Sequence, residues 1–244
     1  MKKNIEIISL IYKSTQYLDF IIKEMTSENC LVDGWGVGLK IVANDPTDNV
    51  KEALKTISIP YDIYYDPKPN DYYMNRVYRC INYAGKTSTY DYLCFINSDM
   101  AFSDKWLTNL IKHIDGINIP CSRLVESGKM ISGTYGISYD CGKNPKSFDR
   151  EKFNKFVLTI SEPKINLGGL YMPCIFEKKR FIESGMYPEG NIYDTGVGNY
   201  GKGKLIKSSD TYFFYDVLEN KYGMKHITVF DSIVYHIQEG EKDD

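Results

Sequence analysis

The chain has 244 residues, a formal net charge of −2, and 43% hydrophobic against 25% charged residues. This composition is ordinary for a globular protein with a core, and the length suffices for one large α/β domain or two small ones. The charge balance argues against nucleic acid as the main partner, because proteins that neutralise many phosphates usually carry a basic excess.

The first half of the chain alternates predicted strands and helices. Residues 5–11 form an apolar, β-branched run typical of a strand buried on both faces, and residues 17–25 repeat apolar side chains at helical spacing. The same reasoning predicts strands over 38–43, 62–65 and 92–96, each followed by a helix. Strands that alternate with helices in this way predict a parallel, doubly wound sheet.

The second half is less regular. Its patterns predict a hairpin over 128–139, a helix over 149–160, a helix over 210–222 and a closing strand over 227–235. Residues 186–207 are rich in Gly, Tyr, Asn and Lys without apolar periodicity, so we expect a long loop. A loop of that length within a compact domain is usually a lid or a binding loop.

Cysteine spacing and hydropathy bear on the compartment. The six cysteines lie far apart and form no C-x-x-C pair, and several stand in apolar runs, so we expect small buried side chains and not disulfides or a zinc site. The N-terminal apolar run is too short for a signal peptide, and no stretch approaches the roughly 18 apolar residues of a membrane span. We therefore expect a cytoplasmic protein without a transmembrane segment.

Three polar clusters follow strands of the predicted sheet. They are Tyr12-Lys13-Ser14, Asn44-Asp45 and Asn97-Ser98-Asp99. Ligands of such sheets bind outside the carboxyl ends of the strands, so we expect the clusters to share one ligand edge. A carboxylate there can hold a divalent cation that bridges the phosphates of a nucleoside diphosphate and makes it a better leaving group. An ordinary strand-end turn, where Asn, Ser and Asp are common, stays open as the alternative.

The order of these motifs resembles the GT-A glycosyltransferases, specifically the inverting family 2 group. The resemblance runs over roughly residues 4–240 and includes a helix that begins near Asp210 and a strand that ends at His236. It implies a Rossmann-like, three-layer α/β fold with a mostly parallel central sheet. It further implies one domain over residues 1–244, with a nucleotide-binding half at 1–115 and an acceptor-binding half at 116–244.

The resemblance implies roles for the residues of the nucleotide and metal sites. Tyr12 and Asp45 match positions that contact the nucleotide, and Asn97-Ser98-Asp99 matches the Asp-x-Asp-like motif that holds the metal and diphosphate. His236 matches a histidine that is a metal ligand in many members, so Asp99 and His236 are the expected ligands of Mn²⁺ or Mg²⁺. Arg76, near the start of the third helix, is expected to meet a phosphate or the base, with a solvated helix face as the alternative.

The implied reaction moves one sugar from a nucleotide-sugar, by family habit a UDP-sugar, to a hydroxyl of a carbohydrate or other acceptor. Inversion requires a base that takes the acceptor proton during attack on the anomeric carbon, and Asp210 is the candidate. The alternative for Asp210 is a carboxylate in a first helical turn, stabilised by the helix dipole by about 0.3–1 kcal/mol. The Gln-x-x-Arg-Trp element of processive synthases is absent from the sequence, which favours transfer of a single sugar.

Two departures from the family pattern keep other functions open. Asn97 stands where many members have Asp, and Ser209 replaces the usual first acid before Asp210. They support a non-catalytic GT-A-like protein that binds a sugar or a partner. A sugar nucleotidyltransferase is the other alternative, although the expected glycine-rich stretch does not follow the first strand.

Residues 196–201 formally match G-x-G-x-x-G, yet they neither follow an apolar strand nor open a helix. We interpret them as a mobile loop that closes over the donor or the acceptor. Lys202, Lys204 and Lys207 are expected to help hold the diphosphate.

Overall fold

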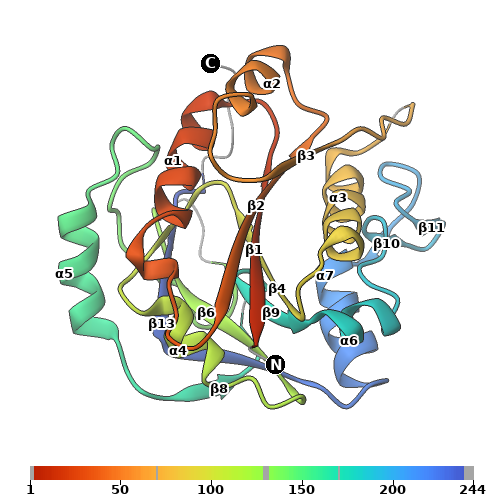
Figure 1. The fold of residues 1–244 in the computed structure, drawn as a ribbon. Helices are drawn as coiled ribbons and strands as arrows, with labels where there is room; N and C mark the ends of the chain where they lie inside the picture. Colours follow the sequence, from red (N-terminus) through yellow and green to blue (C-terminus); the bar gives the residue numbers. More distant parts are fainter. Residues whose placement is uncertain (1–2, 70, 129–131, 170, 239–244) are drawn as a thin grey trace.

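The computed structural model describes residues 3–69, 71–128, 132–169 and 171–238 (Figure 1). They form a large twisted sheet with helices on both faces, so the expected three-layer α/β architecture is confirmed. Within the described residues the large sheet has ten strands. In spatial order these are β3 (Tyr61–Tyr64), β2 (Gly36–Asn44), β1 (Asn4–Ile11), β4 (Tyr92–Asn97), β9 (Cys174–Glu177), β6 (Asn118–Glu126), β13 (Lys225–His236) and β5 (Met100–Phe102), with β7 (Ile137–Ser138) beside β6 and β8 (Ile165–Leu167) beside β13.

The sheet consists of two parallel parts joined by an antiparallel strand. The four strands from β3 to β4 run parallel to one another, and β6 runs parallel to β13. β9 lies between the two parts and is antiparallel to both β4 and β6, while β5 and β8 are antiparallel to β13. The chain moves outward from β1 to β3 and then returns to β4 on the other side of β1. This reversal creates a switch point at the carboxyl ends of β1 and β4, where ligands of such sheets bind.

Separate sets of helices cover the two faces of the sheet (Figure 1). One face carries α1 (Thr15–Met25), the 3₁₀ turn η1 (Glu28–Cys30), α2 (Asp48–Leu54), α4 (Trp106–Ile111) and α5 (Arg150–Ile160); the other carries α3 (Tyr73–Thr87), α6 (Lys178–Glu183), α7 (Ser209–Thr211) and the π-helical segment η2 (Tyr212–Glu219). The pleat of the strands divides the core accordingly. In β4, Ile96 packs on the α1 side, whereas Leu93 and Phe95 pack on the α3 side.

Side-chain caps explain where two of the long helices begin. Ser14 accepts a hydrogen bond from the Tyr17 amide at 3.4 Å and starts α1 directly after β1. Asp149 accepts from the Lys152 amide at 2.9 Å and starts α5, as the predicted helix over 149–160 requires. The first of these caps fixes the turn that brings Tyr12 to the carboxyl end of the sheet.

The second half of the chain departs from its predicted pattern. β6 lies near the middle of the sheet but was not predicted, because Pro120 and Arg123 interrupt its apolar run. Part of the predicted hairpin over 128–139, residues 129–131, lies outside the described residues; within the described part, β7 pairs with β6 in parallel. The predicted loop over 186–207 contains a small sheet of β11 (Gly196–Val197), β10 (Ile192–Tyr193) and β12 (Leu205–Lys207).

The predicted helix over 210–222 exists but is mostly π-helical. The Asn220 amide bonds the carbonyl of Tyr215 at 3.0 Å, which is an i to i+5 hydrogen bond. Phe213 and Phe214 are both fully buried in the core on the α3 side. Throughout the described ranges, none of the helices combines the length and the apolar character that a membrane crossing needs.

Candidate active site

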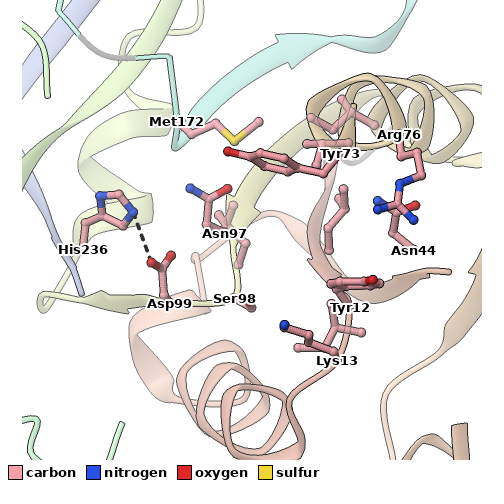
Figure 2. A pocket seen from close by; sticks show the side chains of 15 residues that line it. Tyr12, Lys13, Asn44, Tyr73, Arg76, Asn97, Ser98, Asp99, Met172 and His236 are labelled. Carbon is pink, nitrogen blue, oxygen red and sulfur yellow. Dashed lines mark ion pairs between the residues drawn. The ribbon is translucent and has the colours of Figure 1, made fainter. Parts of the chain in front are cut away.

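A cavity of about 440 Å³ lies at the carboxyl ends of β1, β2 and β4 (Figure 2). Its walls also include the first turns of α3, the turn between β4 and β5, and the end of β13. It therefore occupies the switch point of the sheet. Eight residues singled out from the sequence line it: Tyr12, Lys13, Asn44, Arg76, Asn97, Ser98, Asp99 and His236.

The turn between β4 and β5 presents Asp99 to the cavity. Asn97 is the last residue of β4, and β5 begins at Met100, so the turn is tight. The residues after β13 hold it in place, because the Ile237 amide donates to the Asp99 carbonyl at 3.0 Å and the Gln238 amide donates to Asp99 Oδ2 at 3.2 Å. Asp99 is 6% exposed, so its carboxylate is a fixed, largely buried charge at the cavity wall.

His236 lies between two carboxylates at the end of β13. Its Nε2 is 3.2 Å from Asp99 Oδ2, and its Nδ1 is 3.1 Å from Glu126 Oε1. The parallel pairing of β6 and β13 places His236 directly opposite Glu126. Strand register thus brings together three residues that are far apart in the sequence.

The charges of this group depend on one another. Burial lowers the pKa of His236, but Asp99 and Glu126 outweigh it and raise that pKa to about 10. Burial raises the pKa of Glu126, but the hydrogen bonds from His236 and Ser132 outweigh it and hold that pKa below its usual value. The two carboxylates therefore favour the protonated form of His236.

An aromatic and a basic side chain form the other end of the cavity. Figure 2 shows Tyr12 and Arg76 on the side opposite to Asp99 and His236. The Arg76 guanidinium carbon is 5.5 Å from the centre of the Tyr12 ring, within cation–π range. Tyr12 is 38% exposed, so this end offers an accessible aromatic surface with a cation above it.

Asp45 reaches this end of the cavity indirectly. Its Oδ2 pairs with Arg76 Nη1 at 3.2 Å, and its Oδ1 accepts from the Asp66 amide at 3.2 Å. The Asp45 side chain is 8% exposed, and Asp45 is not one of the described residues that line the cavity. In this structure Asp45 orients Arg76, whereas its neighbour Asn44 contributes to the wall.

Asp210 lies on the first turn of α7. It is not one of the described residues that line the cavity. Its Oδ1 accepts from the Thr211 amide at 2.7 Å and from the hydroxyl of Ser208. Burial and the nearby charge of Asp210 raise the pKa of Tyr78, which places Asp210 beside α3.

Ser209, where the resemblance led us to expect an acid, has a structural role. It is fully buried, and its hydroxyl donates to the carbonyl of Pro188 at 2.8 Å. A carboxylate here would face a carbonyl oxygen, which is also an acceptor. The hydroxyl at Ser209 therefore suits its surroundings.

The loop over 196–207 packs against the start of α3. Asn75 Nδ2 donates to the Gly198 carbonyl at 3.0 Å, and the rings of Tyr72 and Tyr200 stack with centroids 4.0 Å apart. Lys207 pairs with Asp216 of η2 at 2.5 Å. The predicted contact of Lys202, Lys204 and Lys207 with a diphosphate stays a prediction.

Several residues of the site were missed by the sequence analysis. Glu126 was missed because it ends β6, a strand that the sequence did not predict. Its only sequence signal is a glutamate at the end of an interrupted apolar run. Tyr73 on the first turn of α3 and Met172 before β9 also line the cavity, and Figure 2 shows them between its two ends. Their positions depend on tertiary packing that no local pattern encodes.

Comparisons with known proteins give the fold. No protein-family model matches the sequence, and no curated protein matches it. Among solved structures, a mannosyltransferase from Pyrobaculum calidifontis, in complex with GDP-Man and Mn²⁺, matches with a TM-score of 0.58 at 12% identity over 98% of this chain. TarS 1-349 of S. aureus matches with TM-scores of 0.53 in complex with UDP and 0.54 in complex with UDP-GlcNAc, both at 12% identity, over 95% and 98% of this chain.

The chain spans 59% to 62% of the length of these structures. At this identity the similarity shows the fold. The expected GT-A fold, in the form found in glycosyltransferases, is therefore confirmed.

Proposed function

We propose that this protein is a metal-dependent glycosyltransferase that moves one sugar from a nucleotide-sugar to an acceptor hydroxyl with inversion. The observation that carries the proposal is the cavity at the switch point of a GT-A fold, with Asp99 and His236 at one end and Tyr12 and Arg76 at the other. Such a cavity suits an elongated ligand with a charged part and a flat aromatic part. The three structures named above hold a nucleotide or a nucleotide-sugar.

The residues at the first end fit a divalent cation. Asp99 Oδ2 and His236 Nε2 are 3.2 Å apart. Adjacent ligands of an octahedral cation with bonds of about 2.1 Å are separated by about 3 Å, so both atoms suit one ion. The carboxylate oxygen of Asp99 suits Mn²⁺, which is the ion in the matched mannosyltransferase. When bound, such an ion neutralises the diphosphate and makes it a better leaving group.

The number of protein ligands is small. Within the described ranges no group of three or more His, Cys, Asp and Glu side chains is arranged to hold a metal ion. Asn97, in the position of an acid in related proteins, offers a neutral amide oxygen. We therefore propose that the phosphates and water supply the remaining ligands, so that the ion binds more tightly in the presence of the nucleotide.

The second end is proposed to hold the nucleoside. Tyr12 is partly exposed, and its ring is the proposed surface on which a base stacks. Arg76, oriented by Asp45, donates hydrogen bonds to acceptor atoms of the base or of a phosphate. UDP is the proposed nucleotide because TarS binds it, and GDP is the competing choice because the mannosyltransferase binds GDP-Man.

Asp210 is the proposed base for the acceptor. In the proposed step the acceptor oxygen attacks the anomeric carbon, the bond from that carbon to the diphosphate oxygen breaks, and the acceptor proton passes to the Asp210 carboxylate. Because Asp210 lies outside the lining of the cavity, the acceptor would lie between the cavity and α7.

A second candidate function is a GT-A-like protein that binds a nucleotide-sugar without turnover. Its support is the hydrogen bonding of Asp210, whose carboxylate already accepts from Ser208 and Thr211. Asn97 supports it as well, because it leaves one fewer carboxylate at the cation site.

Ligand-induced stabilisation tests the binding part of the proposal. Melting curves with UDP-, GDP- and dTDP-sugars, each with Mn²⁺ or with EDTA, should show one preferred nucleotide and a shift that requires Mn²⁺. At a ligand concentration of one hundred times Kd the stabilisation is about 2.7 kcal/mol, or roughly 5–10 °C in a chain of this size. Asp99→Ala should remove the Mn²⁺-dependent part, and Asp104→Ala, an exposed acid next to β5, should not. The absence of any shift with every nucleotide-sugar would contradict the proposal.

A further inference from the structure

Glu126 is a buried carboxylate at the end of β6. It contacts the side of the His236 ring that is turned away from the cavity. Its side chain is 0% exposed, and a charge so deeply buried is costly unless it is paired and hydrogen-bonded. Its Oε1 lies 3.1 Å from His236 Nδ1, while His236 Nε2 points to Asp99 at the cavity. Figure 2 shows the Asp99 contact on the cavity side of the ring. The two nitrogens of the imidazole therefore have different partners.

Two further hydrogen bonds fix the orientation of the Glu126 carboxylate. Gln238 Nε2 donates to Oε1 at 2.8 Å, and the Ser132 amide donates to Oε2. Both donors come from segments outside β6. The oxygen that faces His236 is thus held in one place by the chain around it.

A carboxylate in this position determines which nitrogen of His236 carries a proton. An ionised carboxylate only accepts hydrogen bonds, so Nδ1 must be the protonated nitrogen when it contacts Glu126. In a neutral imidazole this leaves the lone pair on Nε2, the nitrogen at the cavity. Histidines that bind metals usually donate their other N–H to a carboxylate in this way, and loss of such a partner typically costs 10- to 100-fold in metal affinity.

We propose that Glu126 is a positioning residue that holds His236 in the Nδ1–H tautomer and so presents Nε2 to a divalent cation shared with Asp99. The inference rests on the proposed function for the presence of the cation. A purely structural salt bridge between β6 and β13 is the competing explanation. It predicts a loss of stability on removal of Glu126 but no specific change in metal binding or tautomer.

The first experiment measures Mn²⁺ affinity by electron paramagnetic resonance in the presence of UDP. Glu126→Gln keeps the size of the side chain but can donate its amide to Nδ1, so the affinity should fall by about 10- to 100-fold. Glu24→Gln is the matched control, because Glu24 is also buried and charge-paired, with Arg150, away from the cavity. It should lose stability but keep the wild-type affinity. Equal affinity in Glu126→Gln and wild type, or equal losses in both variants, would overturn the proposal.

A second experiment needs no variant. Nitrogen-15 spectra of the wild-type protein with Zn²⁺ as a diamagnetic probe can resolve His236, since the chain has three histidines. We expect a metal-bound Nε2 and a protonated Nδ1. A metal-bound Nδ1, or His236 without metal contact, would contradict the inference.

The two proposals fail in different ways. Sugar transfer that is retained in full by Glu126→Gln leaves the proposed function standing and removes the role of Glu126. Specific metal binding through His236 Nε2 without any transfer leaves the role of Glu126 standing and removes the proposed function.

Discussion

At the scale of single residues, the site depends on His236 and its two carboxylate partners. In the structure His236 Nε2 lies 3.2 Å from Asp99 Oδ2 at the point proposed for a cation, and the two carboxylates raise the pKa of His236. A cation that binds there takes the place of the proton, because a ligating imidazole must be neutral. Binding of the metal is therefore expected to release a proton.

Arg76 gives a prediction for the other end of the cavity. Arg76→Met keeps the length of the side chain but removes its charge and its donors. Hydrogen bonds to charged groups contribute about 1.5–3 kcal/mol, so nucleoside diphosphate affinity should fall by about 10- to 100-fold, measured by isothermal titration calorimetry. Arg180→Met is the control, because Arg180 pairs with Glu177 at the surface away from the cavity. Equal affinities for wild type and Arg76→Met would remove Arg76 from the nucleotide site.

Much of the site was predictable from the sequence because its residues follow strands. Tyr12 and Asn97-Ser98-Asp99 end or follow apolar strands, and carboxyl ends of parallel strands meet at one edge. Glu126 was not predictable, since its partner in space is set by the register of β6 against β13. Whether Asp210 belongs to the same site depends on an acceptor, and its role stays a prediction.

At the scale of elements, α3 is the part of the fold that joins the cavity to the loop over 196–207. Its first turns carry Tyr73 and Arg76 into the cavity. On another side, Asn75 bonds the Gly198 carbonyl at 3.0 Å. Movement of this loop would therefore act on the cavity through the start of α3.

Asp71 anchors the start of α3 and gives a prediction about pH. Burial raises its pKa, but hydrogen bonds from Arg79 and Asn75 outweigh it and hold the pKa below its ordinary value. A lowered folded pKa stabilises the protein above the unfolded value near pH 3.9, and this stabilisation is lost as the pH falls through the folded value. Asp71→Asn should lower the free energy of unfolding by about 1–3 kcal/mol near pH 7, with a smaller difference below about pH 4.

Denaturant unfolding curves at several pH values measure this difference. Asp48→Asn is the control, because the exposed pair of Asp48 and Lys51 should not contribute measurably. A difference for Asp71→Asn that does not change between pH 7 and pH 3 would show that ionisation of Asp71 does not stabilise α3.

The elements were predicted well where local pattern and tertiary position agree. β1 and α1 are continuous apolar or periodic runs, and they occur close to the predicted ranges. β6 was not predicted, because Pro120 and Arg123 interrupt the apolar pattern of a strand that its neighbours bury. β10 to β12 are only two or three residues long and depend on contacts within the loop, so no sequence period marks them.

At the scale of the whole molecule, the sheet brings together residues from both ends of the chain. Tyr12 directly follows β1, Asn97 ends β4, and β13, near the C-terminus, supplies His236. β9 connects the two parallel parts, so the two ends of the cavity, at Asp99 and His236 and at Tyr12 and Arg76, are joined by one continuous sheet. This arrangement supports a donor that extends across the switch point.

The most direct test of the central claim is release of nucleoside diphosphate from UDP- and GDP-sugars with Mn²⁺, by the wild-type protein, Asp99→Ala, Asp210→Ala and the control Asp104→Ala. The wild type and the control should turn over a donor with Mn²⁺, and neither should do so with EDTA in place of Mn²⁺. The turnover rate of Asp210→Ala should fall by about 10²- to 10⁴-fold, the range for removal of a general base. The turnover rate of Asp99→Ala should fall by at least about 10²-fold. No turnover with any donor, or turnover that survives loss of both Asp99 and Asp210, would contradict it.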